Sequence, residues 1–180
     1  ISGSSDKSIL AWRVDGFFNP LLNQQVGKIG KTGDRAVRVV RYRPVNNDQV
    51  AAGLENGEIQ LWSALPDNQN PIQTFFAQKD DRVLDLAFSQ DSHLLFSGHG
   101  SGAVVQWDLQ PQGVPQTSKP TMVSKTEAGF PVYAIALVGS RETDLAIAGV
   151  RNRLALLNLK TNQLRHIFVD EGSQADYILS

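Results

Sequence analysis

The sequence has 180 residues, of which 41% are hydrophobic and 19% charged, and its 17 basic and 18 acidic residues give a net charge of −1. This balance argues against a dedicated nucleic-acid or membrane-surface binder, because such proteins usually carry a basic excess. No run approaches the roughly 18 apolar residues of a transmembrane helix. The sequence has no cysteine, which excludes disulfides, thiol catalysis and cysteine-ligated zinc from this segment.

Short apolar segments follow one another along the chain and are separated by turn-forming residues. The segments whose composition favours strands include, in chain order, 51–54, 58–62, 72–76, 83–88, 94–96 and 103–107. Asn56-Gly57 is a strong hairpin signal, because a type I′ turn needs a positive φ at both central residues. No long window free of Gly and Pro shows a 3.6-residue apolar period. We therefore expect short strands and essentially no helix.

An internal repeat is visible in the spacing of the large apolar residues. Its anchors, separated by 50, 45 and 50 residues, are Trp12, Trp62, Trp107 and Leu157. Apolar triplets spaced i, i+3, i+5 precede the last three anchors by 24 or 25 residues and begin at Val37, Val83 and Val132. A glycine stands nine residues before each tryptophan, at Gly3, Gly53 and Gly98, whereas Gly149 stands eight before Leu157. Antiparallel four-stranded units that repeat every ~40–45 residues are typical of β-propeller blades.

These residues resemble the WD40 repeat family over nearly the whole chain. The stretch Ile1-Ser-Gly-Ser-Ser-Asp-Lys-Ser-Ile-Leu-Ala-Trp12 is similar to the second half of the family pattern, SGSxDxxIxxW, and 81–91 is similar to its first half, VxxVxFSPDG. Trp107-Asp108 supplies one intact Trp-Asp pair. The resemblance implies an all-β fold made of four-stranded antiparallel propeller blades. About four blades' worth is present here, as part of a seven-bladed or similar ring.

The sequence also departs from the WD40 pattern. The family's Gly-His pair, which precedes the first apolar anchor, is replaced by Thr32-Gly33, Gln78-Lys79 and Glu127-Ala128. The family's turn aspartate survives as Asp6, and its later equivalents are Asn56, Ser101 and Arg151. The resemblance therefore implies that the buried Asp–His–Ser–Trp hydrogen-bond network typical of the family cannot form in the last three units.

The family pattern also divides the chain into units. We expect an incomplete blade at 1–29, complete blades at 34–77, 81–126 and 130–169, and the start of a further blade at 174–180. An open arc would leave apolar blade faces and sheet edges uncovered. The chain also starts at Ile1 without a methionine. We therefore expect it to be one segment of a larger ring, which at seven blades would need about 315 residues.

No group of residues matches a catalytic, cofactor or metal motif. The three histidines, His93, His99 and His166, have no metal-ligand spacing and are expected to face solvent. The loop 98–102 mimics a phosphate-binding glycine loop, but a strand follows it where such a loop needs a helix. Asp80-Asp81 and Asp85 are interpreted as loop and strand residues and not as an acid–base pair. We expect no enzyme activity and no cofactor.

The densest basic cluster is Arg35, Arg38, Arg41 and Arg43. Strand alternation directs Arg41 and Arg43 to one side and Arg38 to the other, which disperses the charge. Nucleic-acid binding would need aligned cations with exposed aromatic residues, and it is kept as an alternative. Solvated or inter-blade arginines are favoured.

The resemblance points to a protein-binding rim. In the family, the loops that join one blade to the next share a face with the loops between the second and third strands. On this chain that rim would gather Asp34, Arg35, Glu55, Asp81, Arg82, His99, Phe130, Arg151 and Arg153. Arginine and aromatic side chains with interspersed acids suit a protein interface. The Pro- and Gln-rich insert 110–120 is expected to be an extended loop on the opposite face.

The resemblance implies a non-catalytic, cytoplasmic scaffold for protein–protein interaction. Its expected partners are other proteins and the remaining blades of the same ring, with no membrane and no cofactor. Two alternatives are kept. One is a propeller sensor or enzyme with a ligand in the central channel, and the other is a nucleic-acid-binding subunit, which steep salt dependence would reveal.

Overall fold

The computed structural model describes residues 1–13, 24–45, 49–64, 70–109, 120–138, 143–149 and 153–168. Within these ranges every regular element is a β-strand, as the composition predicts. Arg151, the insert at 110–119 and the expected blade start at 174–180 lie outside the described residues.

The strands form four antiparallel sheets in the described part of the chain, each a simple up-and-down meander. The first sheet contains β1 (Ser2–Gly3), β2 (Ser8–Arg13) and β3 (Gln24–Lys31). The second contains β4 (Val37–Tyr42), β5 (Gln49–Leu54), β6 (Glu58–Ser63) and β7 (Gln73–Phe76). The third contains β8 (Val83–Phe88), β9 (Leu94–His99), β10 (Ala103–Asp108) and β11 (Thr121–Glu127). The fourth contains β12 (Val132–Val138), β13 (Asp144–Gly149), β14 (Leu154–Asn158) and β15 (Gln163–Phe168).

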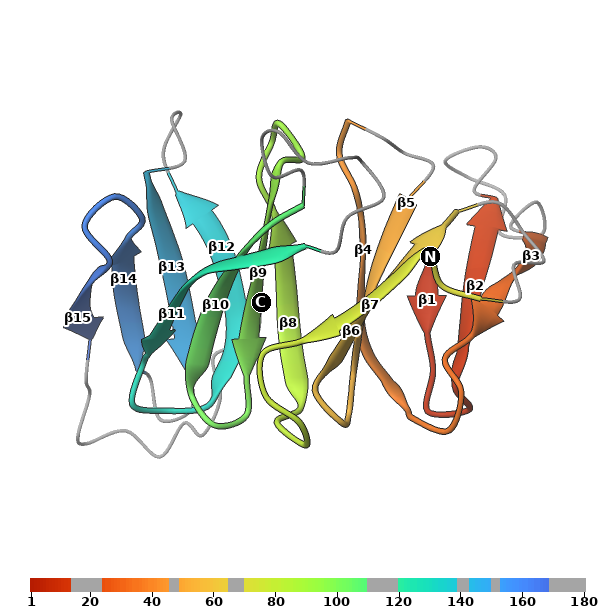
Figure 1. Ribbon diagram of the computed structural model, residues 1–180, viewed down its shortest axis with the longest axis horizontal. Helices are drawn as coiled ribbons and strands as arrows, with labels where there is room; N and C mark the ends of the chain where they lie inside the picture. The colour runs from red at the N-terminus through yellow and green to blue at the C-terminus, as the bar shows by residue number, and fades with distance from the viewer. Residues whose placement is uncertain are drawn as a thin grey trace.

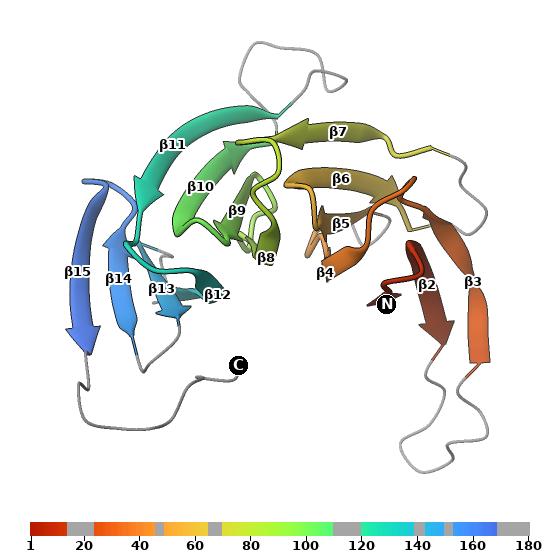
Figure 2. The same cartoon turned by 90° about the horizontal axis from the view of Figure 1, so that it is seen from below.

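The four sheets stand face to face along an arc (Figure 1). Viewed from below, β4, β8 and β12 line the concave side of the arc, and β3, β7, β11 and β15 lie on its convex side (Figure 2). This is the radial arrangement of propeller blades, in which each sheet buries its faces against its neighbours. The all-β propeller-blade fold is thus confirmed.

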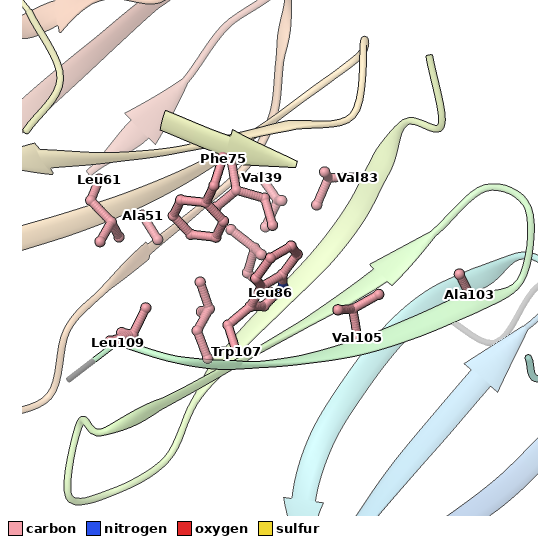
Figure 3. Packing of buried hydrophobic residues seen from close by; sticks show 12 residues of the cluster. Val39, Ala51, Leu61, Phe75, Val83, Leu86, Ala103, Val105, Trp107 and Leu109 are labelled. Atoms are coloured by element: carbon pink, nitrogen blue, oxygen red, sulfur yellow. The ribbon is translucent and has the colours of Figure 1, made fainter. Parts of the chain in front are cut away.

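The core consists of three apolar layers, one between each pair of adjacent sheets. The layer between the second and third sheets includes Leu61, Leu86 and Val105, with the rings of Phe75 and Trp107 edge to face at 4.8 Å (Figure 3). Edge-to-face geometry is favoured by the opposed charge of ring face and ring edge. Because each layer draws on two sheets, the sheets stabilise one another.

The glycine that recurs before each tryptophan lies at a contact between sheets. A β-carbon would lie 2.6 Å from Val83 Cγ1 if built on Gly53, and 2.5 Å from Val132 Cγ1 if built on Gly98. Gly3 meets Val37 in the same way. Each glycine therefore lets the first residue of the following sheet's inner strand approach closely.

Strand pairing corrects the position assigned to Gly149 in this pattern. Val132 pairs with Gly149 as Val83 pairs with His99, so Gly149 is the counterpart of His99. The counterpart of Gly98 is Ala148, which stands nine residues before Leu157.

Candidate protein-interaction surface

On one face of the arc, the loops that join one sheet to the next lie beside the turns between the second and third strands of the sheets. Backbone hydrogen bonds connect these loops and turns. The amides of Glu55, Asp80 and Ala128 donate to the carbonyls of Ala36, Asn56 and Gly102 at 3.1, 2.8 and 2.8 Å. We call this surface the loop face. It comprises 4–7, 32–36, 55–57, 77–82, 100–102 and 128–131, and it forms the lower edge of the molecule in Figure 1.

Four of the predicted rim residues lie on the loop face, three of them exposed and one half-buried. Asp34 has a 97% exposed side chain and lies 3.6 Å from Lys7 Nζ. Arg35 is exposed in the same loop. Glu55 is half-buried and bonds to Arg38, whose hydrogen bond holds the pKa of the Glu55 carboxyl below its usual range. The exposed Arg82 lays its side chain across Gly100.

Two other predicted rim residues, Asp81 and His99, are buried. His99 is 0% exposed and Asp81 7% exposed. Their polar atoms are engaged inside the third sheet, so neither side chain is accessible to a partner. The expectation that all three histidines face solvent is therefore wrong for His99, whereas His93 is exposed and the side chain of His166 is outside the description.

His99 belongs to a buried hydrogen-bond chain in the third sheet. Trp107 Nε1 donates to Ser97 Oγ at 2.9 Å, and Ser97 Oγ lies 2.9 Å from His99 Nε2. His99 Nδ1 lies 3.2 Å from the Asp81 carbonyl oxygen and 3.7 Å from its carboxylate. Asp81 also accepts bonds from the amide and hydroxyl of Ser101, at 2.9 and 2.6 Å. These four residues, Trp107, Ser97, His99 and Asp81, are called the third-sheet tetrad below.

The third-sheet tetrad overturns the expectation that an Asp–His–Ser–Trp network cannot form in the last three units. The WD40 pattern places histidine before the inner strand and aspartate in the turn between the second and third strands. Here Asp81 stands before β8 and His99 ends β9, so the aspartate precedes the inner strand and the histidine comes from the second strand, while the family's own positions hold Lys79 and Ser101. The same groups meet because both positions border one buried space.

These hydrogen bonds assign the tautomer of the neutral His99 ring. The Asp81 carbonyl can only accept, which puts the ring hydrogen on Nδ1 and leaves Nε2 to accept from the Ser97 hydroxyl. The hydroxyl oxygen in turn accepts from the Trp107 indole. Burial lowers the pKa of His99, in agreement with a neutral ring.

The second and fourth sheets fill the corresponding space differently. In the second sheet, Trp62 Nε1 donates to Gln60 Oε1 at 3.1 Å, and Leu54 takes the place of His99. In the fourth sheet, the ring of Phe130 packs against Gly149, and Leu157 needs no hydrogen-bond acceptor. Trp62, Trp107 and Leu157 are therefore each accommodated by a different local arrangement.

Phe130 and Arg153, also predicted for the rim, contact each other. Phe130 is buried, and the Arg153 guanidinium carbon lies 5.8 Å from the centre of its ring. This is a cation–π arrangement. Arg153 Nη1 also reaches the Gly129 carbonyl at 3.5 Å. Of this pair, only the half-buried Arg153 offers polar atoms to a partner.

Arg41 and Arg43 connect the second sheet to the third. Arg41 Nη2 lies 2.6 Å from Asp85 Oδ1, and the buried Arg43 donates to the Ser92 carbonyl through Nε and Nη2 at 3.1 and 2.7 Å. Asp85 Oδ2 accepts from the Ile135 amide at 2.9 Å, so one carboxylate joins three inner strands. Burial raises the pKa of Asp85. These two arginines therefore lie between blades, one of the two states favoured for the basic cluster.

A cluster that the sequence did not single out lies where the concave side meets the loop face. It consists of Arg38, Glu55, Arg82 and Tyr133, from three successive sheets, and we call it the Arg–Tyr cluster. Arg38 bonds to Glu55, and that bond raises the pKa of Arg38, with Tyr133 near enough to add to the rise. The charge of Arg82 contributes to the lowered pKa of Glu55. Tyr133 is 44% exposed.

Strand irregularities explain why this cluster was missed. The pairing register shifts at the second residue of β4 and of β12, which are Arg38 and Tyr133. A bulge breaks the simple alternation of faces. The available signal was positional, because both residues immediately follow the first apolar residue of a triplet.

Among the described residues, no group of three or more histidine or carboxylate side chains could hold a metal ion. In the same ranges, no helix has the length and apolar character to cross a membrane.

Comparison with known proteins places one segment in a family. Residues 69–108 match the family described as WD domain, G-beta repeat. This segment is a WD40 repeat. The resemblance to the WD40 family is thereby confirmed for residues 69–108. The repeat includes β7 of the second sheet and β8, β9 and β10 of the third, and it therefore spans the layer shown in Figure 3. WD40 repeats generally act as non-catalytic protein-interaction scaffolds.

Two larger proteins share shorter stretches with this chain. A 64-residue stretch, 35% of the chain, is 33% identical to the Lysosomal-trafficking regulator of Homo sapiens. A 75-residue stretch, 42% of the chain, is 27% identical to Restriction of telomere capping protein 1 of two Candida albicans strains. The matches cover 2% and 6% of the relatives' lengths, so the chain spans a small part of either protein.

Proposed function

We propose that this chain is a non-catalytic protein-interaction platform that binds partner proteins through the loop face, with the Arg–Tyr cluster as its anchor. The observation that carries the proposal is the Arg38–Glu55 hydrogen bond of the second sheet, with Arg82 near Glu55 and Tyr133 of the fourth sheet near Arg38. Arginine and tyrosine are the residue types in which binding energy concentrates at protein interfaces.

The scaffold beneath the cluster supports this role. Each sheet is packed against its neighbours through an apolar layer, and the third-sheet tetrad and the Asp85 bridge add polar connections. Side chains held on such a framework lose little further freedom on binding, which favours affinity. Of the predicted rim, Asp34, Arg35, Glu55, Arg82 and Arg153 remain proposed contacts, together with Arg151.

The proposal is tested with the natural full-length protein, its double variant Arg82→Ala/Tyr133→Ala, and Lys160→Ala as control. Lys160 is exposed in the β14–β15 turn, away from the loop face. Quantitative affinity capture should recover proteins with the natural form and with Lys160→Ala that the double variant loses. Identical captured sets for all three forms would contradict the proposal. If no protein is captured but a small molecule raises the melting temperature, the channel-ligand alternative is favoured.

A further inference from the structure

A polar groove of about 590 Å³ lies between the first and second sheets. One side is formed by the end of β3 and the β3–β4 loop, which contribute Lys31 and Arg35. The other side is formed by β6 and the segments that flank β7, which contribute Glu58, Asn70 and Lys79. Its volume falls within the range of protein binding sites for small ligands and peptide side chains.

The groove carries an excess of positive charge. Lys31, Arg35 and Lys79 are exposed, and none has a carboxylate of a described residue within 4.0 Å. The two carboxylates of the lining have other contacts, because Asp34 lies beside Lys7 and Glu58 accepts from Gln60 Nε2 at 3.2 Å. Three cations therefore face the groove with their charge available to an anion.

The floor of the groove is held in place by the core. Gln60 is 6% exposed, and its amide is oriented between the Trp62 indole and the Glu58 carboxylate. The Trp62 ring packs directly on Gly30 of β3, which fixes the first sheet against the second. Residues corresponding to Gln60 in the third and fourth sheets are Val105 and Ala155, so this polar floor is specific to the second sheet.

We propose that this groove binds an acidic, extended segment of a partner protein, whose carboxylate or phosphorylated side chains meet Lys31, Arg35 and Lys79. This inference rests on the proposed platform function and adds a second contact site with a defined chemistry. Asn70 provides an amide to the backbone of such a segment. A nucleic acid fits less well, because no aromatic side chain is found among the described residues that line the groove, and base stacking needs one.

The test measures binding of short fluorescein-labelled peptides to the natural full-length protein by fluorescence anisotropy. The probes are a peptide of alternating Glu and Ser, its counterpart with Gln for Glu, and a Gln peptide that carries phosphoserines. A single-stranded oligo-dT is the fourth probe. The Glu peptide, the phosphoserine peptide or both should bind, and which one binds distinguishes the two sources of negative charge.

Charge variants locate the binding. Lys31→Glu and Lys79→Glu should each weaken binding by about fivefold, since each removes and reverses one exposed ion pair. Lys160→Glu makes the same charge change on an exposed turn and should leave the affinity unchanged. Glu58→Gln removes a competing carboxylate while keeping an acceptor for Gln60, and it should strengthen binding.

Four results would overturn the proposal: no binding of either anionic peptide, equal binding of the Gln peptide, equal loss in all three lysine variants, or binding of oligo-dT alone. The platform function stands independently of this outcome. A captured partner that is lost with Arg82→Ala/Tyr133→Ala but kept with Lys31→Glu/Lys79→Glu would support the platform function. The same result would contradict binding in the groove.

Discussion

The hydroxyl oxygen of Ser97 lies 2.9 Å from Nε2 of His99, and both side chains are 0% exposed. The two residues stand on the same side of β9, two positions apart, and the Ser97 hydroxyl also receives the Trp107 indole hydrogen at 2.9 Å. Ser97 is therefore the one group through which the anchor tryptophan and the histidine are both satisfied. In a buried, low-dielectric site such a shared partner has a large effect on stability.

Replacing Ser97 by alanine should lower the free energy of unfolding by about 1–3 kcal/mol, because Trp107 and His99 would each lose a buried hydrogen-bond partner. Urea unfolding of the two proteins measures the difference. Ser124→Ala is the matched control, because Ser124 lies on the outer strand β11 and makes only a 3.4 Å contact with Gln106. A loss of similar size in both variants would argue against the tetrad.

The stability of the protein should decrease as the pH falls below about 6.5, in part through His99. Burial lowers the pKa of His99 in the folded state, so the unfolded chain binds a proton at a higher pH than the folded one. The stabilising contribution is complete above the unfolded pKa and is lost as the pH falls toward the folded pKa. The titration of His99 can contribute at most about 1.4 kcal/mol per pH unit to the slope of the free energy of unfolding against pH.

Unfolding measured across pH 5 to 7 in His99→Gln should show a smaller slope than in the natural protein. His93→Gln, in an exposed turn, should keep the natural slope. An unchanged slope in His99→Gln would show that the ring is not held neutral by burial.

Gly98→Ala should destabilise the protein by about 1–3 kcal/mol, because the new β-carbon would lie 2.5 Å from Val132 Cγ1. The double variant Gly98→Ala/Val132→Ala should recover part of this loss, beyond what the two single changes predict by addition. A double-mutant cycle by thermal unfolding measures the coupling. Simple additivity would mean that the inter-sheet contact is not responsible.

Arg41→Gln should destabilise the protein more at pH 7 than at pH 4. Burial already raises the pKa of Asp85, and removal of its cationic neighbour raises it further. A raised folded pKa means that the stability present below the unfolded pKa of about 3.9 is lost as the pH rises through the folded value. Urea unfolding at both pH values checks this, and an equal loss at the two would show that the ion pair contributes little.

The strands and the repeat could be predicted because their signals are local or periodic. Asn56-Gly57 marked the hairpin between β5 and β6 correctly, but the expected type I′ turn is wrong, because Gly57 has a positive φ and Asn56 does not. The triplets that begin at Val37, Val83 and Val132 became the inner strands β4, β8 and β12. The spacing alone revealed the recurring glycine, but the reason for a glycine at that position is visible only in the structure. There a valine of the neighbouring sheet packs directly against it.

The candidate sites depended on contacts between sheets, which spacing does not encode. Asp81 and His99 were assigned to an exposed rim because both lie at strand ends, and the structure turned both inward against Ser101 and Ser97. Arg38 was assigned to a dispersed basic cluster and Tyr133 was not singled out, because a bulge at each residue breaks the strand alternation on which that assignment relied.

Short apolar strands and turns follow one another in an order that repeats every 45 to 50 residues. This repeat was enough to determine the all-β blades and their anchors. Hydrophobic periodicity acts within one sheet, so any sequence with that pattern reaches the same local result. Which polar groups became structural and which stayed available for binding was decided only when the sheets packed face to face. Packing removed water from Asp81, His99 and Asp85 and left the Arg–Tyr cluster and the lysines of the groove in solvent, and burial is a property of neighbours that no single segment contains.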